Sequence, residues 1–423
     1  MSGQKEIERV IDAVRKHHEL YASALPMIAS ENITSSTVGA LMASDMSHRY
    51  AEGDVGNRFY QGCKYIDEIE AQAIRTAKEL FEAEHVNVKP ISGVIANIAA
   101  LFALTSPRDR IMALSVPNGG HISHSRYSVP EIRDLKLEEL PFDPQEMNID
   151  ADKMAQAIRE KKPTVILLGG SLFLFPHPVR EAREAADEVG AKIVYDASHV
   201  LGLIAGKKFQ DPLREAADVV TSSTHKTFPG PQGAIILCTN RLRDSIDKAV
   251  FPGTVSNHHL HHVAGLAVTL VEMKHFGAEY ASQILSNARV LAESLYEEGL
   301  TVLCEHKGFT ESHQIAVDVR HVGGGDAIAK RLEKAHIITN KNMLPFDETP
   351  EAPSGIRLGV QELTRIGMKE SEMKEIAALI RRVVIAGEDE TKIKEAVIEL
   401  RKGFQHVHYC FDGADAYKFP AVL

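Results

Sequence analysis

One lysine and one aspartate give the strongest chemical signal in this chain. Lys226 lies in the segment SSTHKTFPGPQG, residues 222–233, between a short apolar stretch and a turn stiffened by Pro229 and Pro231. Asp196 ends another apolar stretch thirty residues earlier. A lysine held in this way can carry an aldehyde cofactor as a Schiff base, and the carboxylate can keep a pyridine nitrogen protonated. The pair therefore suggests pyridoxal phosphate (PLP) chemistry on amino acids.

Both residues also have an ordinary interpretation. Lysine is usually a surface residue, and an aspartate after a strand can cap the next helix. Lys226 lies beside His225 and between two expected strands, which favours the cofactor. Asp196 stands at the carboxyl end of its expected strand, where open α/β sheets bind ligands, and His199 follows three residues later.

Two further segments can contact a cofactor. Ser92 and Gly93 follow a short expected strand and begin a helical pattern that runs to about Leu104. Free backbone N–H groups at such a helix start can hold a phosphate, although an ordinary N-cap is the alternative. His121 follows a flexible Gly-Gly pair and can bring a flat imidazole to a cofactor face, or it is an ordinary loop histidine.

Arg357 lies within an apolar stretch, PSGIRLG, residues 353–359. A buried arginine needs an anion, and an amino-acid carboxylate matches its planar fork. A structural salt bridge is the alternative. The histidine-rich segment at 257–262 resembles a metal-binding pattern, but zinc sites usually add a carboxylate or cysteine and a supporting partner. We expect no metal there, and a polar helix start instead.

Composition indicates a soluble globular protein without a nucleic-acid or membrane partner. The chain has 423 residues, 44% of them apolar, and a net charge of −10 with no basic run. This length allows a large core and two domains. The four cysteines are far apart, which fits a reducing compartment. We expect a cytoplasmic protein, because no secretory signal and no bilayer-length apolar run is present.

Short apolar stretches alternate with helical patterns from Tyr65 onwards. Such alternation predicts an α/β fold with a mainly parallel sheet covered on both faces. The expected strands are 111–114, 165–168, 193–195, 219–222 and 234–238, and the expected helices of this part include 65–81, 151–161 and 179–189.

The two ends of the chain follow other patterns. The opening forty or so residues are expected to be helical, and an irregular segment at 48–62 is expected to be functional or interfacial. After about Gly277 the pattern predicts a smaller α+β region, with helices at 281–298, 327–334, 370–385 and 391–402 and a strand at 314–320. We therefore predict an N-terminal helical segment (1–45), a large PLP-binding domain (46–280) and a small C-terminal domain (281–423).

Taken together and in this order, the segments resemble serine hydroxymethyltransferase, a fold-type I PLP-dependent enzyme with the aspartate aminotransferase-like fold. The resemblance extends from about Ala29 to the last helices. It is carried by YAEG (50–53), residues 58–62, Ser92-Gly93, GGH (119–121), Asp196 with His199, STHKT (223–227) and SGIR (354–357).

The resemblance implies the reversible interconversion of serine and glycine, with transfer of the serine hydroxymethyl carbon to a reduced pterin, either tetrahydrofolate or tetrahydromethanopterin. It implies catalytic roles for Lys226, Glu52, Tyr60, His121 and His225. The implied PLP contacts are Ser92, Gly93, His121, Ser171, Asp196, His199, Ser223 and Lys226. The implied substrate contacts are Tyr50, Glu52, Tyr60 and Arg357, and the implied pterin contacts are Glu52, Gly120, His121, Ile122 and Asn342. In this family Tyr50, Glu52 and Tyr60 come from the partner subunit, so the resemblance also implies a homodimer with shared active sites.

Four places depart from the common bacterial and eukaryotic pattern. Val94 replaces a second phosphate-binding serine, and Gln232 replaces the arginine of a GPRGG motif. The segment at 254–257 replaces a glycine-rich phosphate loop that is reached from the neighbouring subunit, and Ser198 replaces an alanine. The first three resemble the archaeal branch of the family. For that reason tetrahydromethanopterin is considered beside folate.

Other functions would use parts of the same residue set. A pterin-independent threonine-type aldolase would use the same lysine, aspartate and arginine, but it would have no need of pterin contacts at Glu52 and Asn342. A non-catalytic PLP-fold protein would be expected to lack Lys226 or Glu52. A transaminase would leave the YAEG segment without a role.

Overall fold

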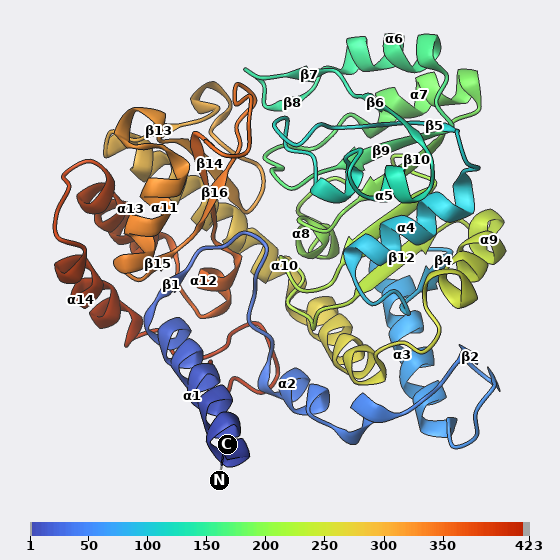
Figure 1. Ribbon diagram of the computed structural model, residues 1–423, viewed down its shortest axis with the longest axis horizontal. Coiled ribbons are helices and arrows are strands. Elements are labelled where there is room, and N and C mark those ends of the chain that lie inside the picture. Colours follow the sequence, from blue (N-terminus) through green and yellow to red (C-terminus); the bar gives the residue numbers. More distant parts are fainter. Residues whose placement is uncertain (1, 418–423) are drawn as a thin grey trace.

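The computed structural model describes residues 2–417, and its largest element is a seven-stranded sheet (Figure 1). The strand order is β4-β12-β11-β10-β9-β5-β6. Their bounds are β4 His85–Asn87, β5 Arg110–Ala113, β6 Lys136–Glu139, β9 Val165–Gly169, β10 Lys192–Asp196, β11 Val219–Ser223 and β12 Ala234–Cys238. Only β12 runs against its neighbours among these strands. The expected mainly parallel α/β sheet is confirmed.

Both faces of this sheet are buried, as the continuous apolar strands require. On β9, Val165 and Leu167 point into one apolar cluster, which includes residues of α4, while Ile166 and Leu168 point into the other, which includes residues of α3 and α7. The helices of this part are α3 Lys64–Phe81, α4 Gly93–Leu104, α5 Val129–Ile132, α6 Ala151–Lys161, α7 Val179–Val189, α8 Leu201–Ala205 and α9 Arg243–Lys248, and a small sheet joins β7 Phe142–Asp143 to β8 Asn148–Ile149.

A second sheet of four strands lies on the other side of the molecule, to the left in Figure 1. Its order is β13-β14-β17-β16. The strands are β13 Thr301–Val302, β14 Gln314–Asp318, β16 Asn340–Asn342 and β17 Gly355–Gly359, and the helices nearby are α11 Gly324–Lys334, α12 Gln361–Arg365, α13 Glu370–Val384 and α14 Glu390–Arg401. The expected strand and three expected helices of this region are confirmed within a few residues.

The helix α10, Leu260–Glu297, connects the two sheets and has 38 residues. It starts earlier than the expected helix at 281 because Leu266, Leu270 and Met273 already face the core. The predicted boundary at residue 280 falls inside this helix, and the division into domains stays a prediction.

The N-terminal segment differs from the expected long helix. The helix α1 ends at Ser23 because Leu25 and Pro26 form strand β1, which pairs in parallel with β15, Ile337–Ile338. Helix resumes only in α2, Ser36–Met42. The irregular segment at 48–62 contains a hairpin of β2, Gly53–Asp54, and β3, Asn57–Arg58. Across residues 2–417, no helix combines the length and the apolar character that a membrane crossing needs.

Candidate active site

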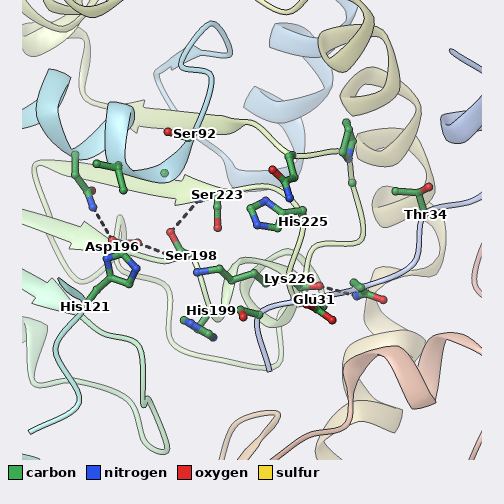
Figure 2. Close-up of a pocket in the computed structure, with 18 of the residues that line it drawn as sticks. Glu31, Thr34, Ser92, His121, Asp196, Ser198, His199, Ser223, His225 and Lys226 are labelled. Atoms are coloured by element: carbon green, nitrogen blue, oxygen red, sulfur yellow. Dashed lines mark hydrogen bonds between the residues drawn. The ribbon is translucent and has the colours of Figure 1, made fainter. Parts of the chain in front are cut away.

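A cavity of about 600 Å³ opens at the carboxyl ends of β10 and β11 (Figure 2). Eight of the expected site residues line it, which agrees with the place where α/β sheets bind ligands. They are Ser92, Gly93, His121, Asp196, His199, Ser223, His225 and Lys226.

Lys226 stands in the loop between β11 and β12. The Thr224 hydroxyl donates to Pro231 O at 2.7 Å, and Asn32 Nδ2 donates to Lys226 O at 2.6 Å, so the loop is held from both sides. The lysine is only 9% exposed, and the surface alternative is wrong. Burial lowers its pKa to about 8, although Asp196 acts in the opposite direction. The pKa therefore lies close to physiological pH, and a larger share of this amine is neutral than in an exposed lysine.

Asp196 is a buried carboxylate with three polar partners. Its Oδ1 accepts from the Ser198 N–H at 3.0 Å, and its Oδ2 accepts from Asn97 Nδ2 at 2.8 Å and contacts His124 Nε2 at 3.0 Å. Burial raises its pKa, but His124, Ser198 and Asn97 outweigh burial and hold the pKa well below its usual range. Because α8 has Val200 as its N-cap, the N-cap interpretation of Asp196 is wrong.

The start of α4 forms one wall of the cavity. Ser92 is its N-cap and accepts from the Ile95 N–H at 3.3 Å, which confirms the predicted helix start. Gly93 keeps this wall close to β11, because an added Cβ would lie 3.3 Å from Ser223 Cβ. The N-cap alternative is thus correct for the Ser92 side chain, while the backbone N–H groups of the first turn remain the part suited to an anion.

Two buried polar atoms at the cavity lack a hydrogen-bond partner within residues 2–417. They are Ser223 Oγ and His225 Nδ1. Buried polar atoms are normally satisfied, so a polar ligand is expected here. One cavity thus contains a helix start suited to an anion, a lysine with a pKa of about 8 and a charged carboxylate. This set fits the phosphate, the aldehyde and the pyridine nitrogen of PLP, in that order.

Two of the histidines that line the cavity, His121 and His199, are held in their neutral form. Burial lowers the pKa of His121 to about 4, and the ring lies beside Asp196 in Figure 2. Burial, together with the cations Lys226 and Arg357, lowers the pKa of His199 well below its usual value. His121 Nδ1 accepts from the Ser123 N–H at 3.1 Å, which fixes that ring.

Arg357 lies on β17 and reaches the segment that follows β9. Its Nη1 donates to Ser171 O at 2.6 Å and to Ser171 Oγ at 2.9 Å, and Asn340 Oδ1 accepts from its Nη2 at 3.2 Å. Burial alone lowers its pKa to about 10, and no carboxylate of residues 2–417 pairs with it. The structural salt bridge is therefore wrong, and a buried cation without its anion remains.

The remaining expected residues do not line this cavity in their own chain. Tyr50 and Tyr60 are 54% and 44% exposed, with ring centroids 5.2 Å apart, and Glu52 accepts from Ser256 Oγ. Ile122 is 57% exposed, and Asn342 Nδ2 donates to Met343 O at 2.6 Å. Gly120 is confined, because a Cβ there would lie 2.2 Å from Leu114 O.

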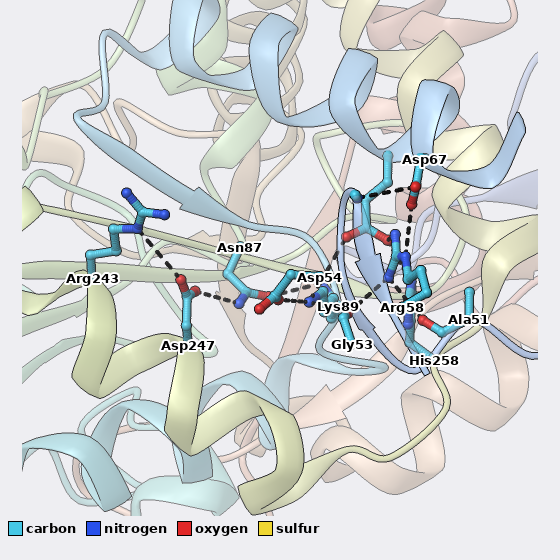
Figure 3. A network of polar contacts seen from close by, with 12 residues as sticks. Ala51, Gly53, Asp54, Arg58, Asp67, Asn87, Lys89, Arg243, Asp247 and His258 are labelled. Atoms are coloured by element: carbon cyan, nitrogen blue, oxygen red, sulfur yellow. Dashed lines mark hydrogen bonds and ion pairs between the residues drawn. The ribbon is translucent and has the colours of Figure 1, made fainter. Parts of the chain in front are cut away.

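Buried charges fix the loop that carries Tyr50, Glu52 and Tyr60 (Figure 3). Arg58 donates to Asp67 at 2.8 Å, to Glu70 at 2.9 Å and to the backbone oxygens of residues 51 and 53, both at 2.8 Å. Lys89 donates to Gly53 O at 2.8 Å, and His258 Nε2 lies 3.0 Å from Glu70. We call Arg58, Asp67, Glu70, Lys89 and His258 the loop cluster. His258 thus has a carboxylate partner, whereas the sequence predicted only a polar helix start there.

Several residues of the site were missing from the expected set. Asn97 and His124 both contact Asp196, and Glu31, Asn32 and Thr34 line the cavity from the N-terminal segment. A polar Asn97 in an otherwise apolar helix, four residues after Gly93, was the available signal. Glu31, Asn32 and Thr34 were not predicted as site residues, because their segment was expected to be helical.

Comparison with known proteins agrees with this geometry. The family described as serine hydroxymethyltransferase matches residues 4–380. A serine hydroxymethyltransferase of Methanocella arvoryzae is 59% identical over 416 residues, covering 98% of each chain, and one of Methanopyrus kandleri is 59% identical over 425 residues, covering 100% of this chain and 99% of the other. One of Methanocaldococcus jannaschii is 57% identical over 414 residues, covering 96% of each. The chain therefore belongs to the serine hydroxymethyltransferase family, PLP-dependent transferases that interconvert serine and glycine with one-carbon transfer to a reduced pterin.

Proposed function

We propose that the cavity around Lys226 is where this chain binds PLP and converts serine to glycine. The observation that carries this proposal is the burial of Lys226, with a pKa of about 8, in the same cavity as the charged Asp196 and the start of α4. When bound, PLP supplies an electron sink for the bonds at the substrate Cα. The residues of the chain supply attachment, orientation and proton control.

Each cavity residue has a defined task in this proposal. Lys226 is the attachment point, and Asp196 holds the proton on the pyridine nitrogen, because its low pKa keeps it charged. The first turn of α4 with Ser92 and Gly93 binds the phosphate, and Ser223 Oγ supplies one more polar partner. His225, Ser171 and the neutral His121 and His199 complete the cofactor contacts.

Arg357 binds the substrate carboxylate. A planar guanidinium that is buried without an anion is suited to a bidentate carboxylate, and Ser171 and Asn340 already fix its plane. Holding the carboxylate sets which bond at Cα is aligned for cleavage. For serine this is the bond to the hydroxymethyl carbon.

A second copy of the chain supplies Tyr50, Glu52 and Tyr60 to each site. Their exposure, together with that of Phe59 at 73%, supports an interface there. Glu52 then moves the proton of the serine hydroxyl, and Tyr60 supports Arg357 at the carboxylate. The enzyme would act as a homodimer in the cytoplasm.

The shared site has a decisive test by complementation. Chains with Lys226→Ala and chains with Glu52→Gln are each expected to be inactive. The two variants are unfolded, mixed in equal amounts and refolded, so that about half of the dimers contain one chain of each kind. If Glu52 crosses to the partner, one of the two sites in each mixed dimer has both native residues, and about a quarter of native activity should return. No restoration would show that each site is built from one chain.

The one-carbon acceptor is a reduced pterin near Gly120, His121, Ile122 and Asn342. The archaeal relatives and Gln232 support considering tetrahydromethanopterin beside tetrahydrofolate. The test incubates the holoenzyme with serine and one carrier at a time and measures glycine. Glycine formed only when a carrier is present supports the proposal. Cleavage of threonine, with serine turnover that neither carrier stimulates, would instead identify an aldolase.

A further inference from the structure

Gln314 is a buried glutamine that reaches from the second sheet into the wall of the active site. It lies at the start of β14 and is 0% exposed. Its Oε1 accepts from the Phe173 N–H at 2.7 Å. Its Nε2 lies 3.0 Å from Ser171 O and 2.7 Å from His199 Nδ1. No residue of the sequence motifs described above pointed to this position.

Two backbone groups determine which way the Gln314 amide faces. A backbone N–H can only donate, so the atom facing Phe173 must be the amide oxygen. A backbone carbonyl can only accept, so the atom facing Ser171 must be the amide nitrogen. The orientation therefore rests on two independent contacts and not on the histidine itself.

This orientation leaves one choice for the His199 ring. Gln314 Nε2 can only donate, so His199 Nδ1 must accept and carries no proton. The ring is neutral, because burial and the nearby cations Lys226 and Arg357 lower its pKa well below the usual value. A neutral imidazole has a single N–H, which is then on Nε2.

The neighbouring residue supports the same ring from its face. His313 stacks on His199 with centroids 5.6 Å apart and an interplanar angle of 19°. Its Nε2 donates to Ala29 O at 3.0 Å, so His313 is itself fixed. Successive residues, 313 and 314, thus hold one face and one nitrogen of His199.

We propose that Gln314 is a positioning residue that fixes His199 in the Nε2–H tautomer and so turns it into a hydrogen-bond donor for the cofactor pocket. The tautomer follows from protein contacts alone. What the donor meets, an acceptor oxygen of PLP such as the ring hydroxyl oxygen, rests on the proposed function.

The substitution Gln314→Glu tests this role with minimal change in shape. Both carboxylate oxygens accept, so Phe173 keeps its partner, while His199 must place a proton on Nδ1 to satisfy the new acceptor. Gln283→Glu is the matched control, because it makes the same change on α10, where Gln283 bonds Asn287 at 2.9 Å. Gln314→Met removes both polar atoms at similar length.

The first measurement is ¹⁵N NMR of histidine ring nitrogens in labelled holoenzyme, with His199 assigned by its loss in His199→Asn. The native enzyme should show a protonated Nε2 and a bare Nδ1, and Q314E should show a protonated Nδ1. A native Nδ1 that carries the proton, or an unchanged tautomer in Q314E, would overturn the proposal. The native spectrum alone is decisive if Q314E does not fold.

The second measurement separates this proposal from the assignment of the cofactor. In Q314E and Q314M, kcat should fall about 10- to 100-fold with little change in the KM for serine, as for other supporting partners of functional histidines. The visible band of bound PLP should shift in both variants and not in Q283E. A native enzyme without any PLP band would refute the proposed function, while the tautomer could still be read from the cofactor-free protein.

Discussion

Asn97 Nδ2 donates to Asp196 Oδ2 at 2.8 Å, and this bond joins α4, the helix proposed to bind the phosphate, to the strand end that carries the carboxylate. The Thr221 hydroxyl donates to Asn97 Oδ1 at 2.6 Å, which fixes the orientation of the amide. Three elements, α4, β10 and β11, are thus connected through one side chain. The distance between the anion end and the carboxylate end of the cavity is set by the scaffold before any ligand binds.

Asp196→Asn should lower kcat/KM by about 10²-fold or more, because a neutral amide cannot hold a proton on the pyridine nitrogen by charge. Steady-state kinetics and a PLP titration measure the loss. Asp187→Asn is the control, since the Asp187 side chain is 71% exposed on α7. A D196N enzyme within twofold of the native rate would contradict the assigned role.

Arg357→Lys should raise the KM for serine about 10- to 100-fold, because a lysine keeps the charge but loses the planar fork, and charged hydrogen bonds contribute about 1.5–3 kcal/mol. Arg320→Lys serves as the control, since that side chain is 45% exposed and pairs with Asp318. Serine and glycine binding should weaken together, because the two share the carboxylate. A loss confined to serine would contradict carboxylate binding by Arg357.

The loop cluster should make a large contribution to folding stability. Burial raises the pKa of Glu70, but His258, Arg58 and Lys89 outweigh it and the pKa is lowered, so its contribution is present above the unfolded pKa and is lost as pH falls. At neutral pH, Glu70→Gln should reduce the unfolding free energy by about 3–5 kcal/mol, since it leaves buried cations unpaired.

Urea unfolding at neutral pH measures that loss. Glu79→Gln is the matched control: Glu79 pairs with Lys274 on the surface, where both side chains are about half exposed, and its loss should change stability little. Equal effects of the two substitutions would show that burial of the loop cluster does not matter.

Glu362 gives a pH dependence of opposite sign. Burial raises its pKa to about 7, with the Tyr417 hydroxyl at 2.5 Å and Arg401 acting against the shift. The folded state therefore keeps a proton that the unfolded state loses above pH 4.5, so this group lowers stability as pH rises from about 4.5 to 7. The full cost above pH 7 is about 3 kcal/mol.

Glu362→Gln should remove this cost, so the variant should be more stable than the native enzyme at pH 8 and nearly equal to it at pH 4.5. The difference in unfolding free energy between the two proteins, measured across this range, isolates Glu362 from other titrating groups. A difference that does not change with pH would disprove the raised pKa.

The sequence predicted the fold best where burial is uniform. The strand at 234–238 and the helices at 151–161 and 179–189 match the structure residue for residue, because the spacing of their apolar residues fits only one type of element. β6 was missed, since three of its four residues are charged and the apolar pattern is absent. β4 corresponds to the short strand expected before Ser92, although its bounds were not predicted. The N-terminal segment was misjudged, because β1 exists only through its distant partner β15.

The site was predictable where a residue has its own local signal. Lys226 follows β11, Asp196 ends β10 and Ser92 caps α4, so their place at the sheet edge follows from the order of elements. Gln314 has no such signal, and Asn97 has only its polarity within an otherwise apolar helix. Their roles depend on partners more than 90 residues away in the chain, and only the folded structure brings them together.

The continuous helix α10 sets how the protein can be divided and deformed. At 1.5 Å per residue, a helix of this size spans roughly 57 Å. It contacts α3, α8 and α13, and Gly277, near its middle, meets Gly206 almost backbone to backbone. A cut at residue 280 would divide α10, and each half would lose the part of this helix that packs against it. Neither half is therefore suited to separate expression. Because α10 is continuous, a change in the angle between the two sheets has to bend this helix and cannot occur by rotation about a loop within it.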